Sequence, residues 1–101
     1  HGSAVRLSVT IRGDKDTVTG RLVDVSPSGL AVRVVKAQRN WFSEGTRLEV
    51  EVDLPHRMEP VRFHATLARV EREALHFLHG LRVDGGSAGR HALSEILSHV
   101  V

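Results

Sequence analysis

Residues 17–35 read TVTGRLVDVSPSGLAVRVV, and this stretch decides the fold. Its two halves are rich in valine and leucine, and Ser26-Pro27-Ser28 separates them with residues that favour turns. The stretch therefore predicts two strands, 17–25 and 29–35, joined by a tight connection.

The strand pattern continues on both sides of this pair. Alternation of apolar and polar residues predicts further strands at 4–11, 48–54, 61–67 and 77–83. The predicted connections are a turn at 12–16, a polar loop at 36–45 and a charged turn at 71–73. Pro55 is expected to end the strand at 48–54.

After Gly85-Gly86-Ser87 the periodicity changes to that of a helix. Leu93, Ile96, Leu97 and Val100 fall at i, i+3, i+4 and i+7, which predicts one short helix from about 89 to 99. Six short strands leave exposed edges unless the sheet closes. The predicted fold class is therefore all-β, a six-stranded antiparallel β-barrel with a C-terminal α-helix that covers one end.

Composition limits the domain organisation. The chain has 101 residues, 41% of them hydrophobic, and no cysteine, so one domain without disulfides is expected and a reducing cytoplasm is the predicted location. His1-Gly2-Ser3 resembles the remnant of a purification tag, which places the domain at 4–101. No apolar run approaches the roughly 20 residues of a membrane span, so we expect no membrane contact by this domain itself.

Charge argues for a small anionic ligand rather than for nucleic acid. The formal net charge is only +2, which argues against one hypothesis for the function, an RNA- or DNA-binding barrel. Twelve of the fourteen cationic residues are arginine, whose planar guanidinium suits phosphate and guanine.

The connection between the predicted strands 17–25 and 29–35 carries the strongest local chemistry. In Asp24-Val25-Ser26-Pro27-Ser28-Gly29, a carboxylate and a hydroxyl stand two residues apart and are expected to point the same way. The carboxylate can accept hydrogen bonds from the N1 and N2 donors of guanine, while Ser26 and the turn offer further bonds. The alternative is architectural, because such residues also stabilise turns through local side-chain to backbone bonds.

This segment resembles the D/N-x-S-x-x-G signature of PilZ domains, which lies between the second and third strands of a six-stranded barrel with a C-terminal helix. His79-Gly80-Leu81-Arg82-Val83 resembles the glycine-containing sixth strand of the same family. The resemblance implies a receptor or regulatory module for the bacterial second messenger cyclic di-GMP, coupled to a fused or partner protein in exopolysaccharide synthesis, motility or biofilm formation.

The resemblance also implies the site. Asp24, Ser26 and Gly29 match the signature and would contact one guanine, with Ser28 beside them in the turn, and Arg69 approximates the position of a side chain that stacks on a guanine face. Arg69 can equally be a solvated charge near a strand end.

The chain departs from the family pattern before the first strand, where an R-x-x-x-R motif usually clamps the phosphates. Arg6 is the only arginine before the first turn, and the residue four positions upstream is Gly2. Either Arg6 stands for the second arginine and the first has been lost, or the motif lies upstream of this sequence. Arg6 would supply a phosphate contact if it faces the site.

Other chemistry is weakly supported. The seven histidines lack paired metal-ligand spacing, and His79 is expected to be a satisfied imidazole in the interior. There is no G-x-S-x-G nucleophile turn, so we predict that this domain is not an enzyme and that it has no cofactor. It can instead be the regulatory domain of a larger enzyme, such as a glycosyltransferase.

The competing hypothesis is a degenerate PilZ-like adaptor that does not bind cyclic di-GMP. In that reading Trp41 and Phe42 contact a protein partner and the Asp24 turn is architectural. Burial of the two aromatic side chains over a barrel end is the alternative.

Overall fold

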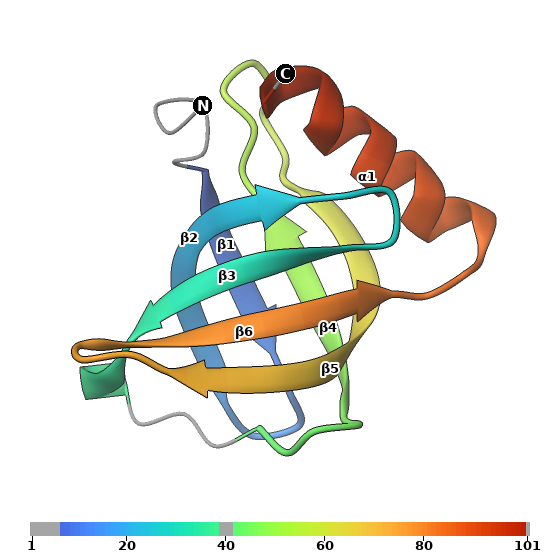
Figure 1. Cartoon of the computed structure of the whole chain (residues 1–101). Coiled ribbons are helices and arrows are strands. Elements are labelled where there is room, and N and C mark those ends of the chain that lie inside the picture. The colour runs from blue at the N-terminus through green and yellow to red at the C-terminus, as the bar shows by residue number, and fades with distance from the viewer. Residues whose placement is uncertain (1–6, 39–41, 101) are drawn as a thin grey trace.

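The computed structural model describes residues 7–38 and 42–100. The strands are β1 (Ser8–Arg12), β2 (Thr17–Val25), β3 (Gly29–Val35), β4 (Arg47–Val52), β5 (Val61–Arg72) and β6 (His76–Val83). A 3₁₀ turn, η2 (Lys36–Gln38), follows β3, and the helix α1 (Ser87–Val100) follows β6. The strands form a closed antiparallel barrel in the order β1-β2-β3-β6-β5-β4, and Figure 1 shows α1 lying across one end of it. The predicted fold class is confirmed.

The order of the strands places β6 between β3 and β5, although β3 and β6 are far apart in sequence. Val32 is opposite His79 in the β3–β6 ladder, and Leu67 is opposite Leu81 in the β5–β6 ladder. The barrel closes where Val9 of β1 is opposite Val52 of β4. As a result, the turn at 26–28 lies beside the last residues of β6 and near the start of α1 (Figure 1).

The apolar phase of each strand fills the barrel. Buried side chains from all six strands and α1 form one cluster: Val9, Ile11, Val18, Leu22, Leu30, Val32, Val34, Leu48, Val50, Val52, Leu54, Val61, Phe63, Ala65, Leu67, Leu81, Val83, Ala92, Leu93 and Ile96. Every strand of a closed barrel has one face toward the interior, which accounts for the period-2 pattern of apolar residues in the sequence.

Among the described residues, His79 is the one polar side chain buried in this interior. It is only 2% exposed, as expected for an interior imidazole. Its Nδ1 atom, however, has no hydrogen-bond partner among the described residues, so the expectation that the ring is satisfied was too simple. Burial lowers the pKa of His79 and outweighs a hydrogen bond with the backbone of Phe77 that raises it.

Several predicted boundaries were wrong, including the end of the strand predicted at 48–54, which ends at Val52, although Leu54 is buried as the alternation implied. β5 continues to Arg72, and Glu71 and Arg72 pair with β6 instead of forming the predicted turn at 71–73. An irregularity between Leu67 and Arg69 breaks the alternation, which hid the second half of this strand from pattern reading. β1 begins at Ser8 rather than at residue 4, with 4–6 outside the described residues, and α1 begins at Ser87 rather than near 89.

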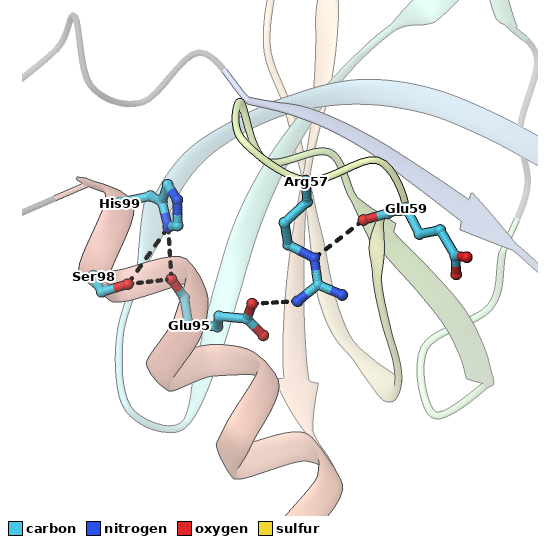
Figure 2. Close-up of polar contacts among 5 residues, drawn as sticks. All are labelled: Arg57, Glu59, Glu95, Ser98 and His99. Carbon is cyan, nitrogen blue, oxygen red and sulfur yellow. Dashed lines mark hydrogen bonds and ion pairs between the residues drawn. The ribbon is translucent and has the colours of Figure 1, made fainter.

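A polar link ties α1 to the loop between β4 and β5. Figure 2 shows the Arg57 guanidinium donating to the Glu95 carboxylate and, through Nε, to the backbone oxygen of Glu59 at 3.2 Å. To the left of this link in the view, the hydroxyl of Ser98 donates to the Glu95 carbonyl oxygen at 2.7 Å. Within the described residues, no helix is long and apolar enough to cross a membrane.

Candidate ligand-binding site

A hollow of about 340 Å³ lies beside the turn that joins β2 to β3, and we call it the Asp24 hollow. Its lining includes five of the six residues predicted to bind a ligand, namely Asp24, Ser26, Ser28, Gly29 and Arg69. The sixth, Arg6, lies outside the described residues. Strand pairing thus gathers residues from β2, β3 and β5 that are up to 45 positions apart (69 − 24).

A single row of register positions crosses the hollow. Asp24 on β2 is opposite Ala31 on β3, Ala31 is opposite Gly80 on β6, and Gly80 is opposite Arg69 on β5. The two central residues carry at most a methyl group. The row therefore forms a flat floor with a carboxylate at one end and a guanidinium at the other.

Asp24 lies just after the irregularity in the β2–β3 ladder, and its side chain is exposed. Its Oδ1 accepts a hydrogen bond from the backbone N–H of Val25 at 2.9 Å. Oδ2 has no such partner in the described part of the chain. One carboxylate oxygen is thus held by the turn and the other is available to a ligand.

The serines organise the turn itself. The backbone N–H of Ser26 donates to the Gly29 carbonyl oxygen at 2.9 Å, which closes a four-residue turn. The Ser26 hydroxyl makes only long contacts, 3.3 Å from the Ser28 backbone nitrogen and 3.4 Å from the Ser28 hydroxyl. The architectural role is therefore real, but it leaves these hydroxyls weakly engaged and exposed.

Gly29 is required by close packing rather than by backbone conformation. Its φ does not fall in the left-handed region, which only Gly45, at 88°, adopts among the described glycines. A Cβ at position 29 would lie 2.2 Å from the carbonyl oxygen of Leu81. Glycine therefore lets the turn approach the backbone of β6.

Arg69 extends across the floor of the hollow. A Cβ at position 80 would lie 3.1 Å from Cγ and 3.4 Å from Nε of Arg69, so the side chain lies over Gly80. Nε is 3.1 Å from a carboxylate oxygen of Glu71, two residues along the same strand. This contact orients the guanidinium beside the space that a planar base would fill.

Sequence reasoning missed Arg82, which also lines the Asp24 hollow. It is opposite Gly29 in the β3–β6 ladder and next to the carbonyl contact described above. Alternation in strand six, with His79, Leu81 and Val83 inward, indicates that Arg82 points outward. Its position beside the serine turn follows only from the pairing of β3 with β6.

Of the two residues of the adaptor hypothesis, the structure describes Phe42, which does not line the Asp24 hollow. Phe42 is half-buried, packs against the core cluster and makes an edge contact with the His79 ring, with centroids 6.5 Å apart. Trp41 lies outside the described residues. Among the residues that the structure places, no group of three or more His, Cys, Asp or Glu side chains is suited to hold a metal ion.

The chain is thus a small closed barrel of six strands with a helix over one end and a hollow at the β2–β3 turn. The sequence pattern of the PilZ domain matches residues 3–97, so the chain belongs to the PilZ domain family. No curated protein matches the sequence closely enough to count as a relative.

Solved structures share the fold at low sequence identity. The PilZ domain of YcgR from Escherichia coli, solved with c-di-GMP, is similar with a TM-score of 0.71 and 20% identity over 93% of this chain and 81% of that one. A YcgR structure in complex with c-di-GMP from the same organism has a TM-score of 0.68 and 19% identity, covering 91% of this chain and 40% of that one.

Bacillus subtilis MotI/DgrA, an inhibitor of motility, has a TM-score of 0.69 and 17% identity over 94% of this chain and 47% of that one. The present chain therefore spans less than half the length of MotI and of the longer YcgR structure.

Proposed function

We propose that this domain is a receptor for cyclic di-GMP that binds one guanine of the ligand in the Asp24 hollow. The observation that carries the proposal is the row Asp24–Ala31–Gly80–Arg69, which crosses four strands with a flat floor between opposite charges. Membership of the PilZ domain family and the likeness to a YcgR domain solved with c-di-GMP support this choice of ligand.

Each end of the row has a separate task. The free oxygen of Asp24 accepts hydrogen bonds from the Watson–Crick edge of guanine, and the hydroxyl of Ser26 adds a further polar contact. The base rests over Ala31, while the guanidinium of Arg69, whose side chain lies over Gly80, stacks on the face or edge of the base. Gly29 keeps the turn close enough to β6 for these groups to converge.

We further propose that the domain is a regulatory module rather than an enzyme, and that it acts in the bacterial cytoplasm. Binding would be passed to a fused or partner protein in motility, exopolysaccharide synthesis or biofilm formation. The length of the solved relatives beyond the matched domain is consistent with such an arrangement.

Calorimetry tests the receptor proposal directly. Cyclic di-GMP is titrated into this chain and into a longer version that adds about twenty native upstream residues, in which the arginine motif of the family would lie. We expect binding at least in the longer version and a loss of about 10- to 100-fold in affinity in Asp24→Ala, because a charged hydrogen-bond acceptor is removed.

Asp53→Ala is the matched control, because Asp53 is an exposed aspartate that does not line the Asp24 hollow. It should retain the affinity of the unmodified protein. Absence of heat in both the short and the long versions would reject the receptor proposal and leave the adaptor reading.

A further inference from the structure

A second hollow, of about 500 Å³, lies next to the first, and we call it the Arg90 hollow. It is lined by the turn residues Pro27 and Ser28, by Thr66 of β5, by Arg82 of β6 and by Arg90 of α1. Arg82 and Ser28 line both hollows. The two spaces therefore share one wall, and a single extended ligand can reach both.

Strand pairing fixes this shared wall. Arg82 is opposite Gly29 in the β3–β6 ladder and opposite Thr66 in the β5–β6 ladder. The backbone N–H of Val83 donates to the Ser28 carbonyl oxygen at 3.0 Å, which holds the serine turn against the end of β6. Thr66 on β5 is thus directly opposite Arg82, and Ser28 precedes Gly29, the residue opposite Arg82 on β3.

The arginines of this hollow differ from most others in the chain. Among the described residues, six arginines are paired with a carboxylate: Arg12, Arg33, Arg47, Arg57, Arg62 and Arg69. Arg82 and Arg90 make no such pair in the described part of the chain, and both are exposed.

Asp84 also lines the Arg90 hollow, but its carboxylate is already paired. It accepts from Nε of Arg47 at 3.0 Å and is 2.9 Å from a second guanidinium nitrogen of the same residue. The acidic group is therefore largely neutralised by Arg47. Two guanidinium groups remain unpaired around one concave space, which favours an anion there.

We propose that the Arg90 hollow is a phosphate subsite, in which Arg82 and Arg90 hold a phosphate of the nucleotide whose guanine occupies the Asp24 hollow. The inference rests on the proposed function. Guanidinium groups bind phosphate through paired hydrogen bonds, and the hydroxyls of Ser28 and Thr66 add donors. The barrel and its helix would then supply phosphate contacts independently of any arginine that precedes β1.

The experiment measures cyclic di-GMP affinity by calorimetry at two salt concentrations in the full chain and in the upstream-extended version. Arg82→Gln and Arg90→Gln should each lower affinity by about tenfold or more, and the double variant should show a shallower dependence on salt. Arg82→Lys keeps the charge but loses the planar fork, so it should lose less affinity than Arg82→Gln.

Arg72→Gln is the matched control, because Arg72 is an exposed arginine of β5 that makes no carboxylate pair in the described residues and lines neither hollow. It removes the same charge and should retain the affinity. Circular dichroism of each variant confirms that the barrel is folded.

Guanosine and inorganic phosphate separate the two halves of the ligand. Guanosine binding should be weakened by Asp24→Ala but not by the double arginine variant. Phosphate should compete with cyclic di-GMP in the unmodified protein and not in the double variant.

Three outcomes overturn the inference in different ways. Unchanged cyclic di-GMP affinity in the double variant rejects the phosphate subsite and leaves the receptor proposal standing. Loss of guanosine binding in that variant assigns the arginines to the base rather than to a phosphate. Absence of cyclic di-GMP binding in the unmodified protein, long and short, rejects both proposals.

Discussion

Arginine side chains have different partners on two walls of the barrel. One wall is formed by β3 and β6, and the second by β1, β4 and the first half of β5. On the second wall, Arg12 and Arg62 both donate to the carboxylate of Glu51, whose side chain is only 14% exposed. Burial alone would raise the pKa of Glu51, but hydrogen bonds and charge from the two arginines lower it overall. These arginines are occupied in holding the barrel together.

On the β3–β6 wall, the side chains are smaller and the charges are less fully paired. Ala31 and Gly80 carry at most a methyl group and leave space over the strands, and Arg82 has no carboxylate partner within the described residues. Small residues and an unpaired cation give this surface the space and the charge that the proposed ligand requires. A surface of the same residue type with complete ion pairs contributes to stability instead.

The largest effect on stability is expected from adding a side chain at Gly29. In Gly29→Ala the new Cβ would lie 2.2 Å from the Leu81 carbonyl oxygen, a backbone atom that no rotamer change can move away. The turn must separate from β6, at a cost of about 1–3 kcal/mol in the free energy of unfolding. Urea denaturation measures this loss, and cyclic di-GMP affinity should fall with it because both hollows adjoin the turn.

Gly86→Ala is the control for this substitution. No atom lies within 4 Å of a Cβ at position 86. Its free energy of unfolding should change by less than about 1 kcal/mol, and in the stabilising direction if the loop tolerates alanine. Equal stability of the two variants would contradict the assignment of Gly29 to close packing.

The local parts of this wall could be predicted from the sequence, and its long-range parts could not. The apolar composition of 17–25 and 29–35 and the turn residues between them predicted β2 and β3 with the bounds that the structure has, and the chemistry of Asp24 and Ser26 is visible within three positions. Arg82 and Arg90 belong to the same surface only because β6 pairs with β3 and α1 packs beside the turn. No spacing in the sequence encodes the pairing of β3 with β6, which begins 41 positions after β3 ends (76 − 35).

The extent of β5 shows a second limit. Its continuation through Glu71 and Arg72 is charged and exposed, so it has the composition of a turn. The ladder with β6 stabilises it through backbone hydrogen bonds that do not depend on side-chain polarity. Gly29 is also determined by a neighbouring strand, because the Leu81 carbonyl group on β6 leaves no room for a side chain at position 29.

A smaller, pH-dependent effect is expected from His79, which is buried behind the hollowed wall. Its folded-state pKa is lowered by burial, so below about pH 6.5 the unfolded chain binds a proton that the folded chain does not. The free energy of unfolding should therefore decrease as the pH falls from 7.5 to 5 and be independent of this residue above that range.

His79→Leu removes the titrating group and the unpaired Nδ1 while keeping a side chain of similar size. We expect its stability to fall less between pH 7.5 and pH 5 than that of the unmodified protein, as measured by urea denaturation at each pH. Identical pH dependence in the two proteins would show that the imidazole is protonated as easily in the barrel as in the unfolded chain.

The smallest effect is expected from the link between Arg57 and Glu95, which joins the β4–β5 loop to α1 on the side with complete ion pairs (Figure 2). The two side chains are 39% and 41% exposed, so water and salt screen their attraction, and we expect a coupling of about 0.2–1 kcal/mol. A double-mutant cycle with Arg57→Gln and Glu95→Gln measures it at low and high salt. The coupling should shrink as salt is added, and Glu95→Gln should leave cyclic di-GMP affinity unchanged because Glu95 lines neither hollow. A coupling above about 2 kcal/mol that salt does not weaken would mean that this pair, despite its exposure, holds α1 in place as firmly as the buried face of the helix does.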